Sequence, residues 1–190
     1  MLWVSSTLVA LSRMSENRAL GIEIEFREVE RLLAKAVDNG DQETLEPQIS
    51  GADRQAVIKR VDHAAAYLRG GRMLWVDDLP RNNIYLKELF RQLGMVVDSA
   101  TSTGEAMACL DHHKYDLVIS DIYRESDPQA GIKMLHEFRT RGISLPVIIH
   151  AARFDPTLGV DPMIFGGTNR IDEVVHYVID VMERVPLRDA

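Results

Sequence analysis

Two short apolar segments that end in aspartate constrain the fold of this chain more than any other feature. Residues 72–76 run directly into Asp77 and Asp78, and residues 117–120 run directly into Asp121. If both segments are parallel strands, the three carboxylates meet at one edge of one sheet. Carboxylates held that close repel one another, so the cluster needs a proton or a cation, and a hard divalent ion such as Mg²⁺ is the simplest partner.

From residue 72 onward, apolar strands alternate with helical segments, which indicates a parallel α/β sheet wound on both faces. We expect strands near residues 73–76, 95–99, 117–120, 146–151 and 163–166, and helices near residues 80–93, 103–112, 128–139 and 170–183. The expected helix starts are marked by Pro80 and Pro128 at first positions and by the candidate capping pairs Ser102 with Glu105 and Asn169 with Asp172.

The region before the sheet is expected to be a helical hairpin. Apolar residues recur at helical spacing from Phe26 to Val37, and Asn39-Gly40 is a stop signal. A second helix starts at Ser50, capped with Asp53, and ends at Gly70-Gly71. So small a hairpin must pack on the neighbouring domain or on a second copy of the chain. We therefore divide the chain into a helical region (1–70, for packing, dimerisation or output), an α/β domain (71–185) and a tail (186–190).

Composition excludes several classes of function. The net charge of −7 gives no electrostatic reason to bind nucleic acid directly. A single cysteine, Cys109, rules out an internal disulfide, fits a buried apolar position and favours the cytoplasm. The apolar stretch at residues 1–11 is shorter than the ~20 residues of a membrane span and lacks a basic leader, so a membrane anchor is the minor interpretation.

The motifs at the strand ends resemble those of the response-regulator receiver domain of two-component signalling. They are Val76-Asp77-Asp78, Ile119-Ser120-Asp121, Gly131 at the next helix and Leu145-Pro146-Val147-Ile148 at the fourth strand. The resemblance covers residues 72 to about 185 and implies a flavodoxin-like fold. It also implies a histidine kinase or phosphotransfer protein as partner.

The resemblance implies a role for each acidic residue. Asp121 would accept the phosphoryl group, Asp78 would be the more direct Mg²⁺ ligand with Asp77 beside it, and Tyr123 would contribute its backbone carbonyl. An aspartate that attacks phosphorus needs the incoming negative charge neutralised, and a metal ion does that. The opposing interpretation is that these are solvated aspartates at strand ends, where aspartate is common.

The sequence departs from the family where the phosphoryl group would be sensed. Ala151 stands at the position of the Thr or Ser after the fourth strand, and Thr168 stands at the position of the lysine that ends the fifth strand. A stabilising cation is missing unless Arg170 or Arg153 reaches in. Residues 152–162 contain Pro156, Gly159 and Pro162, so the fourth helix of the family is expected to be very short or absent.

Other polar residues are expected to have ordinary structural roles. Arg124, in the long loop after Asp121, could supply charge near the site, although an exposed loop arginine is more often solvated. The pair His112-His113 suits a helix C-terminus without any ligand, and the same holds for the other helical histidines His63, His136 and His176. His150 either points into the core or, if the strand register slips by one residue, approaches the acidic pocket.

The sequence therefore predicts a cytoplasmic, non-enzymatic receiver that accepts phosphate on Asp121 with Mg²⁺ as cofactor. It passes its signal by protein contacts, with a homodimer through the N-terminal helices as one possibility. A second hypothesis is a phosphorylation-independent pseudo-receiver that serves as an interaction module, supported by Ala151 and Thr168. A third, a metal-dependent phosphatase or nuclease, lacks a second set of catalytic carboxylates and a general acid.

Overall fold

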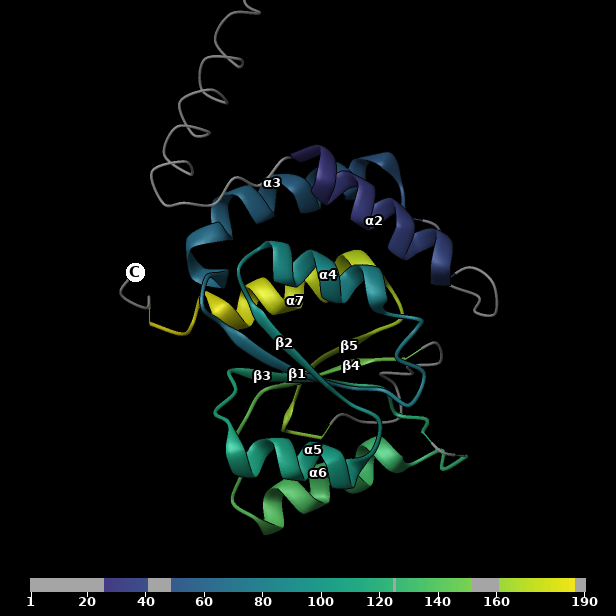
Figure 1. The fold of residues 1–190 in the computed structure, drawn as a ribbon, viewed down its shortest axis with the longest axis vertical. Coiled ribbons are helices and arrows are strands. Elements are labelled where there is room, and N and C mark those ends of the chain that lie inside the picture. The colour runs from purple at the N-terminus through teal and green to yellow at the C-terminus, as the bar shows by residue number, and fades with distance from the viewer. Residues whose placement is uncertain (1–25, 41–48, 125, 152–160, 187–190) are drawn as a thin grey trace, which may run out of the picture.

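The computed structural model describes residues 26–40, 49–124, 126–151 and 161–186. Its centre is one sheet of five parallel strands in the order β2-β1-β3-β4-β5 (Figure 1). The strands are β1 (Arg72–Val76), β2 (Val96–Ala100), β3 (Leu117–Ser120), β4 (Val147–His150) and β5 (Ile164–Thr168). This order confirms the five-stranded, doubly wound, flavodoxin-like sheet expected from the alternation of strands and helices.

Helices cover both faces of this sheet, and two further helices form an additional layer (Figure 1). On one face lie α4 (Ile84–Gln92) and α7 (Ile171–Met182), and on the other lie α5 (Thr103–His112) and α6 (Ala130–Thr140). The N-terminal hairpin, α2 (Phe26–Gly40) and α3 (Gly51–Leu68), lies outside α4 and α7. The central strands β1, β3 and β4 are therefore buried almost throughout, whereas the edge strands β2 and β5 are partly exposed.

The alternation of side chains along the strands builds two cores. Met73 and Trp75 of β1 join Ile119 of β3 on the side of α4 and α7. Leu74 and Val76 pack on the opposite side, against α5 and α6. All five side chains are at most 1% exposed. Because neighbouring residues face opposite sides of a strand, the two residues that follow β1 start towards opposite sides as well.

The N-terminal hairpin is part of the first core. Helix α2 packs mainly on α4, and α3 packs mainly on α7. Val29 and Leu33 of α2 and Val57 and Leu68 of α3 are buried in the same apolar cluster as Trp75. The chain thus buries the apolar stripes of its hairpin on its own α/β domain, which is the packing alternative. Dimerisation and output remain proposals.

The predicted cap of α3 is present. The Ser50 hydroxyl accepts a hydrogen bond from the Asp53 amide at 3.2 Å, and the Asp53 carboxylate accepts one from the Ser50 amide at 3.2 Å. The helix ends at the expected glycines, where Gly70 adopts φ +70°. That left-handed conformation favours glycine over any residue with a Cβ, so the turn into β1 is encoded locally.

The expected starts of α4 and α6 are too early, and the expected cap of α7 is wrong. Helix α4 begins at Ile84, because residues after Pro80 form a turn in which the Asn82 amide donates to the Leu79 carbonyl at 3.0 Å. Helix α6 begins at Ala130 instead of residue 128. Helix α7 begins at Ile171, one residue from the expected start, with no cap from Asn169. At α5 the expected Ser102 cap forms, but the Glu105 carboxylate accepts from the Thr101 amide.

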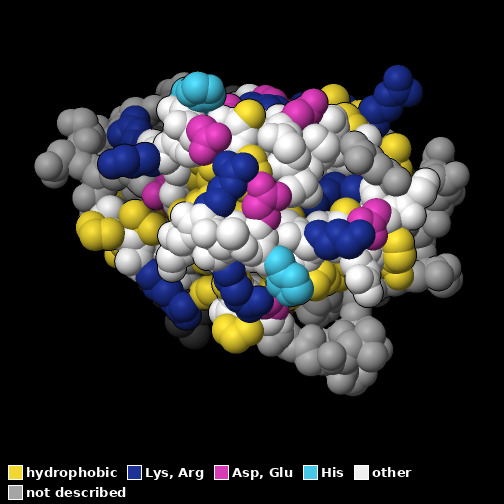
Figure 2. Space-filling view, turned by 90° about the horizontal axis from the view of Figure 1, so that it is seen from below, with side chains coloured by type: hydrophobic (Ala, Val, Ile, Leu, Met, Phe, Trp, Pro, Cys, Tyr) yellow, Lys and Arg dark blue, Asp and Glu magenta, His cyan; other side chains and the backbone are white. Residues whose placement is uncertain are grey.

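Several expectations fall outside the described residues: the segment 1–11, most of the loop between β4 and β5, with Arg153 and the shortened fourth helix, and most of the tail. Cys109 is half-buried against the core under α5 and α6. In the described parts of the chain, no helix has both the length and the apolar character needed to cross a membrane. On the face seen in Figure 2, basic and acidic side chains are interspersed and no patch of one sign dominates.

Candidate functional site

The strand register brings Asp77 and Asp121 together. Strands β1 and β3 are parallel neighbours, with Val76 opposite Ser120. Asp77 and Asp121 are the next residues on each strand, and the Asp121 amide donates to the Val76 carbonyl at 3.1 Å. The two carboxylates therefore start from adjacent positions at the carboxyl edge of the sheet, where folds of this kind bind ligands.

Asp77 is a buried carboxylate held by two donors. It is 4% exposed. Its Oδ1 accepts from the Leu79 amide at 2.8 Å, and its Oδ2 accepts from Asn83 Nδ2 at 2.6 Å. These bonds tie the loop after β1 and the first turn of α4 to the same carboxylate, which fixes its orientation. Asn83 was not identified from the sequence, although its position six residues after the first aspartate could have suggested it.

Asp121 is partly desolvated and lies beside a second negative charge. Its Oδ1 accepts from the Tyr123 amide at 3.1 Å. Burial raises the pKa of Asp121 to about 6, and the negative charge of Asp77 acts in the same direction, while the Tyr123 amide opposes both. A partly desolvated carboxylate beside another carboxylate favours the binding of a proton or a cation. This is the electrostatic condition that the sequence predicted for the pocket.

Arg124 is buried, and the expectation that it is solvated is wrong. The residue is 2% exposed because the loop folds back at Ser126, which adopts φ 67°. Its guanidinium donates to the Ser120 hydroxyl at 2.5 Å, to the Asp121 carbonyl at 2.8 Å and to the Thr103 hydroxyl at 3.1 Å. Arg124 therefore holds the backbone of Asp121 against α5. No local pattern reveals this, because Thr103 lies 21 residues away.

Gly131 holds the other side of the same loop. Its amide donates to the Ile122 carbonyl at 3.0 Å. A Cβ at this position would lie 2.9 Å from the Asp121 carbonyl oxygen and 2.9 Å from Ile122 Cα. These are backbone atoms that cannot rotate away, so only glycine lets α6 approach the candidate acceptor this closely.

A site with three carboxylates is not assembled by the described residues. Within these parts of the chain, no group of three or more His, Cys, Asp or Glu side chains is arranged to hold a metal ion. Asp78 follows Asp77 and is half-buried, and Tyr123 is 51% exposed. Asp77 and Asp121 nevertheless form an all-oxygen pair, and Mg²⁺ is commonly bound by one or two carboxylates with water and phosphate completing its shell. The pair fits Mg²⁺ on this chemistry.

Among the described residues at the β4–β5 end of the same edge, the two positions singled out from the sequence are engaged elsewhere. Ala151 is buried, and its amide donates to the Thr168 carbonyl at 3.2 Å. The Thr168 hydroxyl accepts from the Arg170 amide at 2.9 Å and donates to Glu173. Arg170 forms ion pairs with Asp172 and, at 3.1 Å, with Asp53 of α3. Thr168 and Arg170 thus bind the start of α7 and the hairpin.

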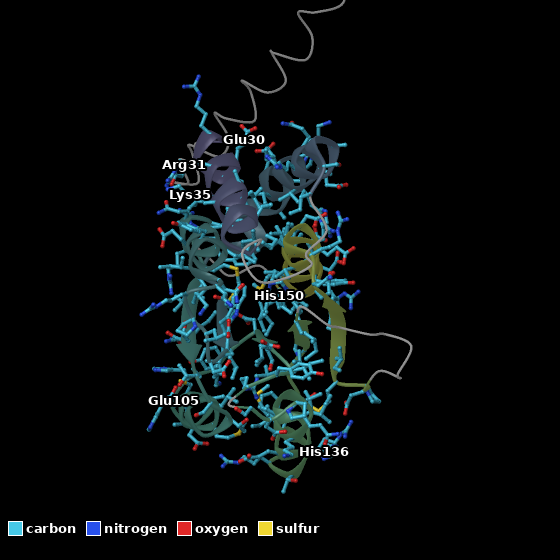
Figure 3. The ribbon with its side chains drawn as sticks, turned by 90° about the vertical axis from the view of Figure 1, so that its right-hand side faces the viewer. Glu30, Arg31, Lys35, Glu105, His136 and His150 are labelled. Atoms are coloured by element: carbon cyan, nitrogen blue, oxygen red, sulfur yellow. The ribbon has the colours of Figure 1, made fainter. Side chains whose placement is uncertain are left out.

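His150 points into the core, as the first of the two interpretations expected. Figure 3 shows it inside the molecule between the sheet and α7, whereas His136 lies on α6, on the opposite face of the sheet. Its Nδ1 is 3.3 Å from the Thr168 carbonyl oxygen, and its ring meets Trp75 edge to face at 6.2 Å between centroids. Desolvation lowers the pKa of His150, which keeps the imidazole neutral.

The comparisons with known proteins agree with this geometry. The chain matches the family model described as the response regulator receiver domain over residues 73–171. It is similar to the structure of response regulator protein TrrA from Thermotoga maritima in complex with Mg(2+)-BeF, with 25% identity and a TM-score of 0.51 over 58% of this chain and 98% of that chain. No match was found among curated proteins.

Two further structures show the same fold. The receiver domain of the Francisella response regulator 1452 is 23% identical, with a TM-score of 0.53 over 60% of this chain and 98% of that chain. A response regulator receiver protein from Pseudomonas putida is 21% identical, with a TM-score of 0.51 over 58% and 97%. The family match begins at β1, so α2 and α3 precede it. By its sequence match and its fold, the chain belongs to the response regulator receiver domain family.

Proposed function

We propose that this receiver accepts a phosphoryl group on Asp121 from a histidine kinase or a phosphotransfer protein. The observation that carries the proposal is the in-register pair of Asp77 and Asp121, in which desolvation and a neighbouring charge raise the pKa of the candidate acceptor to about 6. Such a carboxylate gains more from a bound cation than one in water does. The other half of the proposal, a signalling role in the cytoplasm, follows from the family.

The chemistry assigns a task to each side chain. An Asp121 carboxylate oxygen attacks phosphorus, the bond from phosphorus to the histidine nitrogen of the donor breaks, and the imidazole leaves with the electron pair and takes up a proton. Asp77, Asp78, Asp121 and the Tyr123 carbonyl would hold Mg²⁺, which neutralises the charge that accumulates on the phosphoryl oxygens. Arg124 and Gly131 keep the backbone of Asp121 in place during the transfer.

The surface around the pocket supports a protein as phosphodonor. Leu79 and Tyr123, each two residues after an aspartate of the pair, are 58% and 51% exposed, and Ile84, the first residue of α4, is 53% exposed. Exposed apolar side chains beside a polar centre are typical of protein interaction sites. We propose that the donor protein covers these three side chains when its phosphohistidine enters the pocket.

The N-terminal hairpin is the proposed route for output. Helices α2 and α3 pack on α4 and α7, and Arg170, two residues after β5, is ion-paired to Asp53 of α3. A change at the carboxyl edge that moves the start of α7 would thus move α3 as well, through the ion pair between Arg170 and Asp53. The exposed side of the hairpin would then contact the downstream protein or a second copy of the chain.

The test uses beryllofluoride, a phosphoryl mimic, because the T. maritima relative was solved with Mg(2+)-BeF. We expect Mg²⁺ with beryllofluoride to raise the thermal unfolding temperature of the full chain, and Asp121→Ala to abolish that rise. Asp111→Ala is the matched control, because Asp111 is 65% exposed and lies in α5. An equal response in Asp121→Ala and in the wild type would exclude Asp121 as the acceptor.

A second function, a phosphorylation-independent interaction module, is favoured by one observation. Ala151 has no hydroxyl, and the Thr168 hydroxyl is used by Arg170 and Glu173, so neither reports on a phosphoryl group. The wild-type chain could fold normally and yet show no change in unfolding temperature with Mg²⁺ and beryllofluoride. In that case the pseudo-receiver function replaces the phosphoryl-accepting function.

A further inference from the structure

A buried lysine lies beneath the acidic pocket and has no role in the function proposed above. Lys87, in α4, is only 3% exposed. Lysine is rarely buried to this extent unless a negative charge compensates for the loss of hydration. Desolvation lowers the pKa of Lys87, and the charge of Asp77 acts against that shift. The charge that compensates the ammonium is therefore part of the acidic pocket.

The positions of three neighbours place the ammonium on the Asp77 side of the sheet. Lys87 Nζ lies 5.5 Å from the centroid of the Trp75 ring. Trp75 precedes Asp77 by two residues in an extended segment, so both start on the same face. Asn83, one helical turn before Lys87, donates to Asp77 Oδ2 at 2.6 Å. Residues four apart share one side of a helix, so α4 directs Asn83 and Lys87 towards Asp77.

Two other described cations near this edge, Arg170 and Arg124, have partners of their own. Arg170, near the position where the family has its lysine, is ion-paired with Asp53 and Asp172. Arg124 binds the backbone carbonyl of Asp121 and the hydroxyls of Ser120 and Thr103, and its charge also opposes the rise in the pKa of Asp121. Within the described residues, Lys87 is thus a buried cation on the Asp77 face whose charge is available to the pocket.

We propose that Lys87 is a positioning residue that supplies a second internal positive charge, in addition to Arg124, for a phosphoryl group on Asp121, in place of the lysine absent at Thr168. This inference rests on the proposed function. Lys87 acts through Asp77 from within the core, whereas a lysine at the end of β5 would act from the rim. The positive charge of Lys87 stabilises the negative charge that a phosphoryl group brings into the pocket. The same charge repels Mg²⁺ and so weakens the binding of Mg²⁺ alone.

This electrostatic role predicts two effects of opposite sign. In Lys87→Met, which keeps the length of the side chain and its contact with Trp75, Mg²⁺ alone should bind roughly fivefold more tightly, because a repelling charge is gone. Beryllofluoride at saturating Mg²⁺ should bind roughly fivefold more weakly, because an attracting charge is gone. A residue with a merely structural role would weaken both ligands together.

The experiment titrates the full chain with Mg²⁺ alone and then with beryllofluoride, following binding by calorimetry. Lys87→Arg should retain both wild-type constants, and Lys133→Met, at a 65% exposed lysine of α6, should change neither. Lys87→Gln is the second uncharged variant if Lys87→Met does not fold. If the binding constants for Mg²⁺ and beryllofluoride are both unchanged, or both weakened, in the uncharged variant, the proposal for Lys87 is wrong, while the proposed function of Asp121 still stands. Absence of any beryllofluoride binding in the wild type would overturn the proposed function with it.

Discussion

The two halves of the carboxyl edge of the sheet do different work. At the ends of β1 and β3, Asp77 and Asp121 lie in register. Arg124 and Gly131 hold in place the loop that follows β3 (residues 121–129), called the acceptor loop after its proposed role. At the ends of β4 and β5, Ala151, Thr168 and His150 are engaged with the core and with the start of α7. The comparison indicates that the acidic pair and the departures at Ala151 and Thr168 lie on separate strands, so the sequence at one end can change while the geometry at the other is kept.

The largest effect is expected at the acceptor loop. Gly131→Ala should destabilise the fold by about 3 kcal/mol, because its Cβ would lie 2.9 Å from two backbone atoms of the acceptor loop. Gly104→Ala is the matched control, since both glycines are the second residue of a helix and the new Cβ at Gly104 would approach nothing closer than 3.9 Å. Urea unfolding measures both, and equal effects would contradict a close approach at Gly131.

The next effect concerns the buried arginine on the same half. Arg124→Met should cost about 2 kcal/mol of stability, because the Ser120 hydroxyl and the Asp121 carbonyl lose a charged donor inside the protein. Arg141→Met, at a 41% exposed arginine with surface ion pairs, should cost less than about 0.5 kcal/mol. Chemical denaturation of the two variants compares a buried arginine with an exposed one. Similar losses would show that burial does not matter here.

The two halves should respond to acid with opposite signs. His150 has a lowered pKa in the fold, so its contribution to stability is lost as the pH falls through the unfolded value of about 6.5. Asp121 has a raised pKa of about 6, so the fold gains from its protonation as the pH falls below that value. Between pH 7.5 and 5.5, His150→Phe should therefore lose less stability than the wild type.

Asp121→Asn is the contrasting variant in the same measurement. It should lose more stability than the wild type on acidification, because the gain from protonating Asp121 is absent. Unfolding free energies at the two pH values decide the matter. Identical pH dependences of the unfolding free energy in the wild type and in His150→Phe would mean that the pKa of His150 is not lowered in the folded state.

The smallest effect is expected at Thr168, which stands where the family has a lysine. Thr168→Val keeps the shape of the side chain but removes the acceptor for the Arg170 amide and the donor to Glu173. We expect a loss of roughly 0.5 to 1 kcal/mol, as for a helix cap, with an unchanged response to beryllofluoride. Thermal unfolding with and without the mimic tests both statements. A weaker beryllofluoride response would assign Thr168 a role in the pocket.

Much of the site was predictable because it depends on local sequence. Asp77 and Asp121 each follow directly on an apolar strand. Once those two strands pair in parallel, the aspartates lie side by side, whatever the conformation of the loops that follow. The same holds for the Ser50 cap and for the glycine turn before β1. The helix starts were predicted less well, because Pro80 and Pro128 permit a first helical turn but do not compel one, and nearby turns and side chains intervene.

By itself, the sequence determined the five-stranded parallel sheet, the position of the acidic pair and the departures at Ala151 and Thr168. These features depend on periodicity of two or 3.6 residues and on residue identity, which act over short distances along the chain. Only the tertiary structure decided that Arg124 and Lys87 are buried and which face of the sheet each serves. Burial of a long charged side chain depends on partners far away in sequence, such as Thr103 for Arg124 and Trp75 and Asp77 for Lys87, and no local pattern encodes them.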